Sequence, residues 1–372
     1  MQKNWISLGL MSGTSGDGVD ASVIKTNGTN KYELIEDKYF EYDSGIYKDI
    51  HNLKEKINKI EDLKIYNKEL DNLERKITIF HARLVKELNI SDETIVGFHG
   101  QTIYHNPKEK ISRQLGNGKL LKQLTNKSVV FNFRKNDILN GGQGAPLTPV
   151  FHYLLSIQNK IKLPVCFLNI GGISNITIIT NKDNLSELTS KDLGPGNCLI
   201  DSWVRKNSNK KFDKDGYLSF SGKSNKIIYE QAQELYMNSI NEKKFSYDVN
   251  DFDVSFVRGL TLEDGAATLT DFTASIISKE ILISLENCKE KVQDILVCGG
   301  GRKNKYFIQK IKENLPININ LKLVDDYKID GDFIESQAFA YLAIRAILKL
   351  PISFPGTTLC NTPSAGGELI EN

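Results

Sequence analysis

The chain has 372 residues, of which 40% are hydrophobic and 25% charged, an ordinary composition for a globular protein of about two domains. Its 48 basic and 46 acidic side chains leave a formal net charge of only +2, which excludes the strongly basic surface that nucleic acid binding requires. No apolar run approaches the roughly 18 residues of a membrane-spanning helix, and we recognise no secretion signal. We therefore expect no nucleic acid partner, no membrane insertion and no secretion.

The first part of the chain combines short strands with one long helical stretch. β-branched and aromatic residues predict strands at residues 5–11, 19–26, 32–42, 95–99 and 128–133. Between the third and fourth of these, at about 46–90, apolar residues recur at helical spacing among lysines and glutamates, which predicts solvated helices.

The second part opens with the same kind of unit as the first. An apolar strand at 165–170, two glycines and a β-branched strand at 174–180 repeat the strand, Gly-rich turn and strand of the N-terminus about 160 residues later, which is too far for a solenoid repeat. Helices and strands then alternate, with helices predicted at 198–206, 266–285, 303–313 and 336–348 and strands at 295–298 and 321–324. A duplicated α/β domain accounts for this pattern.

We therefore predict an α/β protein of two related domains with a cleft between them. Residues 1–148 and about 350–372 form the predicted N-terminal domain, which includes the helical insertion at about 46–90. Residues 149–349 form the predicted C-terminal domain.

The turn after the first strand contains glycines and hydroxyl side chains in an unusual density. Ser12, Thr14 and Ser15, together with backbone N–H groups, are suitable donors to a phosphate. Asp17 and Asp20 would repel a bare phosphate, so their presence indicates an accompanying Mg²⁺. The alternative is a tight hairpin turn without a ligand.

Another group of glycines follows the predicted strand at 295–298. Gly299, Gly300 and Gly301 precede a predicted helix, as nucleotide-binding turns do, but the last glycine of the dinucleotide fingerprint is missing. No P-loop motif occurs anywhere in the chain. The spacing of these glycines alone is a weak indication of nucleotide binding.

Two carboxylates have positions that suit catalysis. Asp192 precedes a Gly-Pro-Gly turn, which can hold a carboxylate with little freedom, as a general base requires. Equally, Asp192 can end a strand while Asn197 caps the next helix. Glu335 directly precedes the predicted helix at 336–348, where a carboxylate is commonly a partner of the helix dipole.

Arg134 and His99 are two further candidates for the site. Arg134 precedes the glycine-rich segment 141–146 and could bind a substrate carboxylate in bidentate fashion, or form a surface salt bridge with Asp137. His99 is more often a buried, hydrogen-bonded histidine than a base in such a setting.

Seven motifs follow one another along nearly the whole chain. They are GLMSGTSxDGxD at 9–20, HGQT at 99–102, GGQGAP at 141–146, NIGGISN at 169–175, DxGPGN at 192–197, CGGG at 298–301 followed by Asn304, and ESQAFA at 335–340. In composition and order they resemble the anhydro-N-acetylmuramic acid kinase family. Departures are few: Phe98 and Asn132 stand where the family often has Ser and Asp, and Leu359-Cys360 stands where it usually has Gly.

The resemblance implies an actin- or hexokinase-like fold, with two duplicated ribonuclease H-like domains that close on ATP and Mg²⁺. It implies an enzyme that opens the 1,6-anhydro ring of anhydro-N-acetylmuramic acid and phosphorylates the 6-oxygen, producing N-acetylmuramic acid 6-phosphate and ADP. This reaction belongs to peptidoglycan recycling. Family members are cytoplasmic, act on this small amino sugar and are usually homodimers.

The resemblance also implies roles for individual residues. Asp192 is the implied general base, and Glu335 helps to position the attacking water. The implied ATP and phosphate contacts are Gly13, Thr14, Ser15, Gly16, Asp17, Gly18, Val19, Asp20, Gly171, Gly172, Ser174, Asn175, Gly299, Gly300, Gly301 and Asn304, with Asp17 as the metal ligand. The implied sugar contacts are His99, Gln101, Thr102, Arg134, Gly142 and Gln143, with Arg134 at the lactyl carboxylate.

Three other functions stay open at this point. A kinase of the same fold could act on another sugar or acid and keep the phosphate-binding turns. An actin- or chaperone-like switch would hydrolyse ATP with or without sugar and would need no base such as Asp192. A structural scaffold without nucleotide is disfavoured by the density of Gly, Ser and Thr in the turns.

Overall fold

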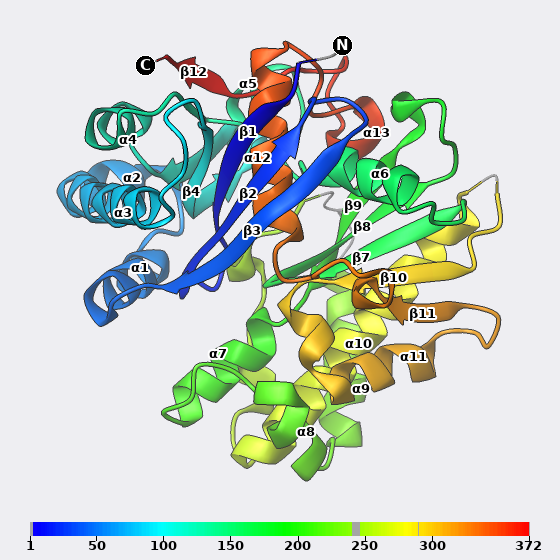
Figure 1. The fold of residues 1–372 in the computed structure, drawn as a ribbon. Coiled ribbons are helices and arrows are strands. Elements are labelled where there is room, and N and C mark those ends of the chain that lie inside the picture. Colours follow the sequence, from blue (N-terminus) through cyan, green and yellow to red (C-terminus); the bar gives the residue numbers. More distant parts are fainter. Residues whose placement is uncertain (1–2, 240–245, 289, 372) are drawn as a thin grey trace. The chain divides into compact units, whose positions relative to one another are not determined.

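The computed structural model describes residues 3–239, 246–288 and 290–371 (Figure 1). The chain forms two compact units, each with its own sheet. Unit 1 comprises Met1–Ile161, Asn181–Thr189 and Asp332–Asn372, and unit 2 comprises Lys162–Thr180 and Ser190–Gly331.

The sheet of unit 1 has seven strands. They are β1 (Trp5–Ser12), β2 (Gly18–Thr26), β3 (Tyr32–Glu41), β4 (Ile95–Asn106), β5 (Ile111–Leu115), β6 (Val129–Phe131) and β12 (Glu368–Ile370). Their order is β12-β6-β4-β1-β2-β3, with β5 paired to β4. The hairpins β1–β2 and β2–β3 are antiparallel, whereas β4 pairs with both β1 and β6 in parallel.

The sheet of unit 2 has five strands in the order β11-β10-β7-β8-β9. They are β7 (Val165–Ile170), β8 (Ile173–Ile179), β9 (Thr189–Pro195), β10 (Asp294–Cys298) and β11 (Asn320–Leu323). Strands β7 and β8 form an antiparallel hairpin, and β10 is parallel to both β7 and β11.

The two sheets therefore repeat one topology. In each, the first strand lies between its antiparallel hairpin partner and a parallel strand that the chain reaches only after a long excursion. The predicted α/β class with two duplicated halves is confirmed. The repeated pattern of strand, glycine-rich turn and strand predicted this duplication. In both sheets that turn joins the two strands of the first hairpin.

The helices of unit 1 include the expected insertion. They are α1 (Ser44–Lys56), α2 (Ile60–Ile65), α3 (Asn67–Glu87), α4 (Gly118–Thr125), α5 (Lys135–Leu139), α6 (Pro149–Gln158), α12 (Ile334–Ile347) and α13 (Pro355–Thr358), with 3₁₀ turns η1 (Pro107–Glu109) and η2 (Leu185–Glu187). Helices α1 and α3 bury one apolar face, including Ile50 and Ile77, in the core that contains Leu8 of β1. An amphipathic helix pair of this kind is stabilised mainly by that burial.

The helices of unit 2 surround the long helix α10. They are α7 (Cys198–Asn207), α8 (Tyr217–Ser221), α9 (Lys226–Ser239), α10 (Leu262–Glu286) and α11 (Lys305–Asn314), with 3₁₀ turns η3 (Lys214–Gly216), η4 (Val249–Asp251), η5 (Ser255–Val257), η6 (Gly300–Lys303) and η7 (Val324–Tyr327). Helix α10 contributes Leu269, Phe272 and Ile276 to the core of this unit and contacts α7, α8, α9 and α11.

Helix α12 packs across the first sheet, on β1, β2 and β4 (Figure 1). Two glycines permit this approach. A Cβ atom at Gly9 would lie 1.9 Å from the carbonyl oxygen of Ser336, and one at Gly97 would lie 2.4 Å from that of Phe339. Gly9, which opens the motif at 9–20, and Gly97 therefore both serve helix packing.

The boundaries of the units differ from those of the predicted domains. We placed 149–349 in the C-terminal domain, but α6 and α12 both lie in unit 1. The reason is tertiary: α12 follows the last strand of unit 2 in the chain, yet its small residues and the glycines beneath it fit the first sheet.

Candidate functional site

The turn between β1 and β2 exposes two of the three hydroxyl groups that the sequence assigns to phosphate, whereas Ser12 is buried. Thr14 and Ser15 are exposed, and Gly16 has φ +63°, a conformation that favours glycine. The Gly16 N–H donates to the Gly13 carbonyl at 3.1 Å, and Ser15 Oγ donates to Asp17 Oδ1 at 2.6 Å. The turn thus has a fixed backbone beneath two accessible hydroxyls.

The base of this turn is held by buried side chains. Ser12 Oγ donates to Gln101 Oε1 at 2.6 Å, and Gln101 Nε2 donates to the Gly13 carbonyl at 2.9 Å. Gln101 is fully buried, so its amide spans the turn from below. It was predicted to contact sugar, and the structure gives it these two bonds within the turn.

The other residues predicted in this turn divide by depth. Gly18 and Val19 already belong to β2, and the Val19 side chain lies in the core. Asp17 is half-buried, and its carbonyl accepts the N–H of Tyr42 at 2.9 Å. Asp20 is half-buried within β2.

The corresponding turn of unit 2 is joined to the loop after β9. The N–H groups of Gly196 and Asn197 donate to the carbonyls of Gly172 and Gly171, each at 2.8 Å. The buried Ser174 hydroxyl donates to the carbonyls of Gly194 and Pro195, both at 3.2 Å. These bonds bring two separate sequence motifs into one backbone structure.

Asn175 lies directly after this turn and offers an acceptor. Its Oδ1 is buried, and it has no hydrogen-bond partner among the residues that the structure describes. A buried polar atom without a partner is costly, so a bound donor would stabilise it.

The three consecutive glycines after β10 have different surroundings. A Cβ atom at Gly299 would lie 2.3 Å from Asn169 Oδ1, and one at Gly301 would lie 2.3 Å from Ile170 Cγ2, so both pack against the end of β7. A Cβ atom at Gly300 would meet nothing within 4 Å. Only the middle glycine of the three therefore faces open space.

Asn304 closes this segment. Its Oδ1 accepts the N–H of Phe307 at 2.9 Å and thereby caps α11. Gly216 of η3, at φ +77°, approaches the same side chain so closely that a Cβ atom there would lie 2.2 Å from Asn304 Oδ1.

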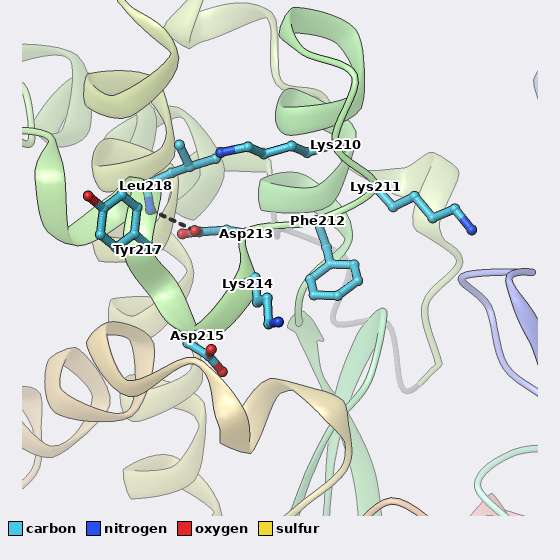
Figure 2. Close-up of a pocket in the computed structure, with 8 residues that line it drawn as sticks. All are labelled: Lys210, Lys211, Phe212, Asp213, Lys214, Asp215, Tyr217 and Leu218. Atoms are coloured by element: carbon cyan, nitrogen blue, oxygen red, sulfur yellow. Dashed lines mark hydrogen bonds between the residues drawn. The ribbon is translucent and has the colours of Figure 1, made fainter.

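A cavity of about 610 Å³ lies beside Gly216 (Figure 2). Its lining residues are Lys210, Lys211, Phe212, Asp213, Lys214, Asp215, Tyr217 and Leu218. Asp213 is buried and accepts the N–H groups of Leu218 and Ser219 at 2.7 and 3.0 Å, which fixes the wall of the cavity. Phe212 and Tyr217 expose their aromatic rings.

Asp192 lies inside β9 and does not end it. The residue is 7% exposed, and its Oδ2 accepts the backbone N–H of Tyr247 at 2.9 Å. Burial, followed by the charge of Glu280, raises the pKa of the Tyr247 phenol. One carboxylate oxygen of Asp192 is thus oriented by a backbone donor. Asn197 occupies the N-cap of α7 without a capping bond from its side chain.

Arg134 and His99 form a connected pair in unit 1. The guanidinium donates to His99 Nε2 from Nε at 3.1 Å and from Nη2 at 2.9 Å, and to the Gly144 carbonyl from Nη1 at 2.7 Å. Burial, and next the charge of Arg134, hold the pKa of His99 well below its usual 6.5. His99 is therefore neutral, accepts at Nε2 and donates from Nδ1 to the Gly100 carbonyl at 2.8 Å. Both of its ring nitrogens are thus hydrogen-bonded, and Nε2 supports the arginine.

The remaining predicted sugar contacts lie near this pair. Gln143 donates its N–H to the Thr358 carbonyl at 2.7 Å, and a Cβ atom at Gly142 would lie 2.2 Å from Asp137 Oδ2. Thr102 Oγ1 accepts from Gln114 Nε2 at 3.2 Å. The sequence identified this loop, but it did not identify Thr358 as its anchor.

Glu335 is half-buried in the first turn of α12, whereas the predicted helix at 336–348 begins directly after it. It belongs to unit 1, whereas Asp192 belongs to unit 2. Within residues 3–239, 246–288 and 290–371, no three His, Cys, Asp or Glu side chains gather closely enough to hold a metal ion by themselves.

Comparison with known proteins decides the family. A sequence model of anhydro-N-acetylmuramic acid kinase matches residues 5–371. The protein of that name from Pelagibacter ubique (strain HTCC1062) is 57% identical over 375 residues, covering 100% of both chains. The one from Agrobacterium fabrum (strain C58) is 35% identical, covering 98% of each. The chain belongs to the anhydro-N-acetylmuramic acid kinase family.

A more distant likeness exists among solved structures. Component A of (R)-2-hydroxyglutaryl-CoA dehydratase from Acidaminococcus fermentans is 11% identical with a TM-score of 0.43, covering 93% of this chain and 100% of that one. In the part of the chain that the structure describes, no helix is both long and apolar enough to cross a membrane.

Four groups in this family member escaped the sequence reasoning. They are the cavity around Phe212, the Tyr247 N–H on Asp192, the Thr358 anchor, and Lys54, whose Nζ donates to the Thr14 carbonyl at 2.6 Å. Lysine is so abundant here that Lys54 carried no signal. The sequence signal for the cavity is limited to the aromatic residues Phe212 and Tyr217 near Gly216.

Proposed function

We propose that this protein is an ATP-dependent kinase that hydrolytically opens the 1,6-anhydro ring of anhydro-N-acetylmuramic acid. The released 6-oxygen is phosphorylated, producing N-acetylmuramic acid 6-phosphate and ADP in the recycling of peptidoglycan. The observation that carries this proposal is the 57% identity to a protein of that name over the full length of both chains.

Asp192 acts as the general base in this proposal. Its carboxylate takes a proton from the water that attacks the anomeric carbon, while the bridge oxygen leaves that carbon and accepts the phosphoryl group. Because the Tyr247 N–H binds Oδ2, the carboxylate has a fixed orientation before substrate arrives. Glu335 assists in positioning the water.

The two hairpin turns and the glycine triplet bind the nucleotide. Bound ATP with Mg²⁺ supplies the phosphoryl group and neutralises the charge that develops during its transfer. The donors of this chain are the exposed Thr14 hydroxyl and the backbone of the β7–β8 turn, and the Ser15 hydroxyl joins them when it turns from Asp17 to the phosphate. Asp17 is the proposed metal ligand, directly or through water. The open face at Gly300 and the neighbouring cavity receive the adenosine.

Arg134 binds the lactyl carboxylate of the sugar. Its guanidinium is held by His99 Nε2 and the Gly144 carbonyl, which orient its planar donors before the sugar binds. We further propose that the enzyme is cytoplasmic and a homodimer, as the family resemblance implies.

The test is to incubate the purified protein with ATP, Mg²⁺ and 1,6-anhydro-N-acetylmuramic acid and to detect the sugar phosphate. We expect Asp192→Asn to lower the turnover rate by ~10²-fold or more, because the amide can still accept from Tyr247 but cannot take a proton. Asp183→Asn removes the same charge from an exposed loop and should leave the rate unchanged.

Each failure has its own meaning. Full activity of Asp192→Asn would contradict the assignment of the base. A parent protein that hydrolyses ATP equally with and without the sugar would favour a switch. A parent that phosphorylates a different sugar or acid would leave the fold assignment intact and replace the substrate.

A further inference from the structure

We propose that Asp137 and Thr358 are positioning residues that fix the sugar-binding loop 141–146 and, through it, Arg134. Asp137 lies in α5 and Thr358 in α13, 221 positions apart, and neither belongs to the sites predicted above. The inference rests on the proposed function, because it concerns how the same enzyme holds its acidic sugar.

The central contact is a buried carboxylate with neutral donors. Asp137 is 1% exposed; its Oδ2 accepts the Gly144 N–H and its Oδ1 accepts the Thr358 hydroxyl, both at 2.6 Å. The Cys360 thiol also contacts this carboxylate, and its pKa is raised by burial first and by the charge of Asp137 as well. A buried carboxylate is tolerated only when such donors satisfy it, so the contacts act together.

Thr358 holds the loop directly through its backbone carbonyl and indirectly through Asp137. Its hydroxyl meets Asp137, and its backbone carbonyl accepts the Gln143 N–H at 2.7 Å. Thr358 and Asp137 are both buried. Two consecutive N–H groups of the loop are therefore bound by this pair of residues. The Gln143 N–H donates to the Thr358 carbonyl, and the Gly144 N–H donates to the Asp137 carboxylate.

Gly144 links the Asp137 carboxylate to Arg134 through its own backbone. Its N–H is bound by Asp137, and its carbonyl accepts from Arg134 Nη1 at 2.7 Å. The residue has φ +74°, a conformation that other residues adopt only at a cost. The orientation of this one residue thus couples the Asp137 carboxylate to the guanidinium that meets the sugar.

The loop also depends on close packing with the carboxylate. A Cβ atom at Gly142 would lie 2.2 Å from Asp137 Oδ2, and the side chain of Ile138 fills the space beside Gly144. A shift of the Asp137 side chain therefore requires a shift of the loop. Displacements of about 1 Å in such supporting groups reduce reaction rates by as much as 10²-fold.

The experiment compares Thr358→Val, which removes the hydroxyl at nearly constant shape, with Thr358→Ser, which keeps it. We expect Thr358→Val to raise the KM for the anhydro sugar about tenfold, as expected for the loss of an interaction worth about 1.4 kcal/mol, with the KM for ATP within twofold of the parent. Thr358→Ser should recover the sugar KM to within threefold. An equal rise of both KM values, or a valine variant with parental sugar KM, would overturn the proposal.

A double substitution tests the route through Arg134. In an Arg134→Ala background, Thr358→Val should change kcat/KM for the sugar by less than twofold, because the group it positions is gone. A full tenfold loss in that background would show that Thr358 acts independently of Arg134.

Amide hydrogen exchange separates this inference from the proposed function. Thr358→Val should accelerate exchange at Gln143 and Gly144 at least tenfold, while a core strand such as β7 keeps its parental protection. Unchanged exchange at both amides would refute the anchoring itself, whichever substrate the enzyme uses. A parent without sugar kinase activity but with accelerated exchange in the variant would place the failure in the proposed function.

Discussion

Gln101 illustrates how a residue within a binding motif can serve the fold of the site. The motif His99–Thr102 resembles a sugar-binding stretch, and all its polar side chains were assigned to the sugar. In the structure His99 supports Arg134, whereas Gln101 is buried and spans Ser12 and Gly13 in the turn between β1 and β2. Neighbouring side chains of β4 thus support two different parts of unit 1.

We predict that Gln101→Ala raises the KM for ATP about tenfold and lowers the free energy of unfolding by about 2 kcal/mol, since two buried hydrogen bonds are lost at about 1 kcal/mol each. Steady-state kinetics and urea denaturation measure the two effects. Gln123→Ala, at an exposed position in α4, is the matched control. If Gln101 instead binds sugar, the KM for the sugar will rise while that for ATP stays constant.

At the scale of elements, close packing explains two glycines, of which Gly9 opens the motif at 9–20 that the sequence associates with phosphate. Gly9 and Gly97 lie under α12, where backbone carbonyls occupy the space that a side chain would need. Gly300, by contrast, has open space around it. Glycine therefore allows a helix to pack closely at Gly9 and Gly97, whereas at Gly300 it leaves open space. Only the neighbouring elements distinguish these two cases.

We predict that Gly97→Ala destabilises the protein by about 1–3 kcal/mol, because the new methyl group must displace α12. Gly300→Ala should leave stability within about 0.5 kcal/mol of the parent and raise the KM for ATP severalfold, because its methyl group would occupy the proposed nucleotide face. Thermal and urea denaturation with nucleotide kinetics measure both variants. Equal destabilisation by the two substitutions would contradict the distinction.

At the scale of the whole molecule, buried histidines make stability depend on pH although the net charge at pH 7 is close to zero. Burial lowers the pKa of His81 to about 4 and that of His152 to about 3, from the usual 6.5. The folded protein keeps both neutral at pH values where the unfolded chain binds protons. Stability is therefore complete above pH 6.5 and is lost as the pH falls from 6.5 toward the folded-state pKa values.

We predict that lowering the pH from 7.5 to 5.5 decreases the free energy of unfolding by about 1 kcal/mol for each such histidine, because one pKa unit corresponds to about 1.36 kcal/mol. His81→Leu should reduce this pH-dependent loss by about 1 kcal/mol, whatever its effect on stability at pH 7.5. Urea denaturation at both pH values measures the difference. An unchanged pH dependence in the variant would show that His81 does not titrate on unfolding.

The sequence by itself determined the duplicated α/β plan, the three glycine-rich turns and the family. These features depend on local patterns: the alternation of apolar residues, the density of Gly, Ser and Thr, and the order of motifs. Strand β7 was predicted at its observed bounds, and Asp192 and Arg134 were identified as candidates. Their partners Tyr247 and Gly144 were not, because backbone donors and acceptors have no residue-specific signature.

Only the tertiary structure decided how distant segments meet. It placed α12 on the first sheet, put Gln101 beneath the β1–β2 turn, and joined Asp137 to Thr358 across 221 positions. The physical reason is that such contacts depend on strand register and on helix packing over many residues, whereas sequence patterns report mainly the periodicity of each element. A motif therefore indicates which residues gather at a site, and packing decides which of them meet the ligand and which hold the others in place.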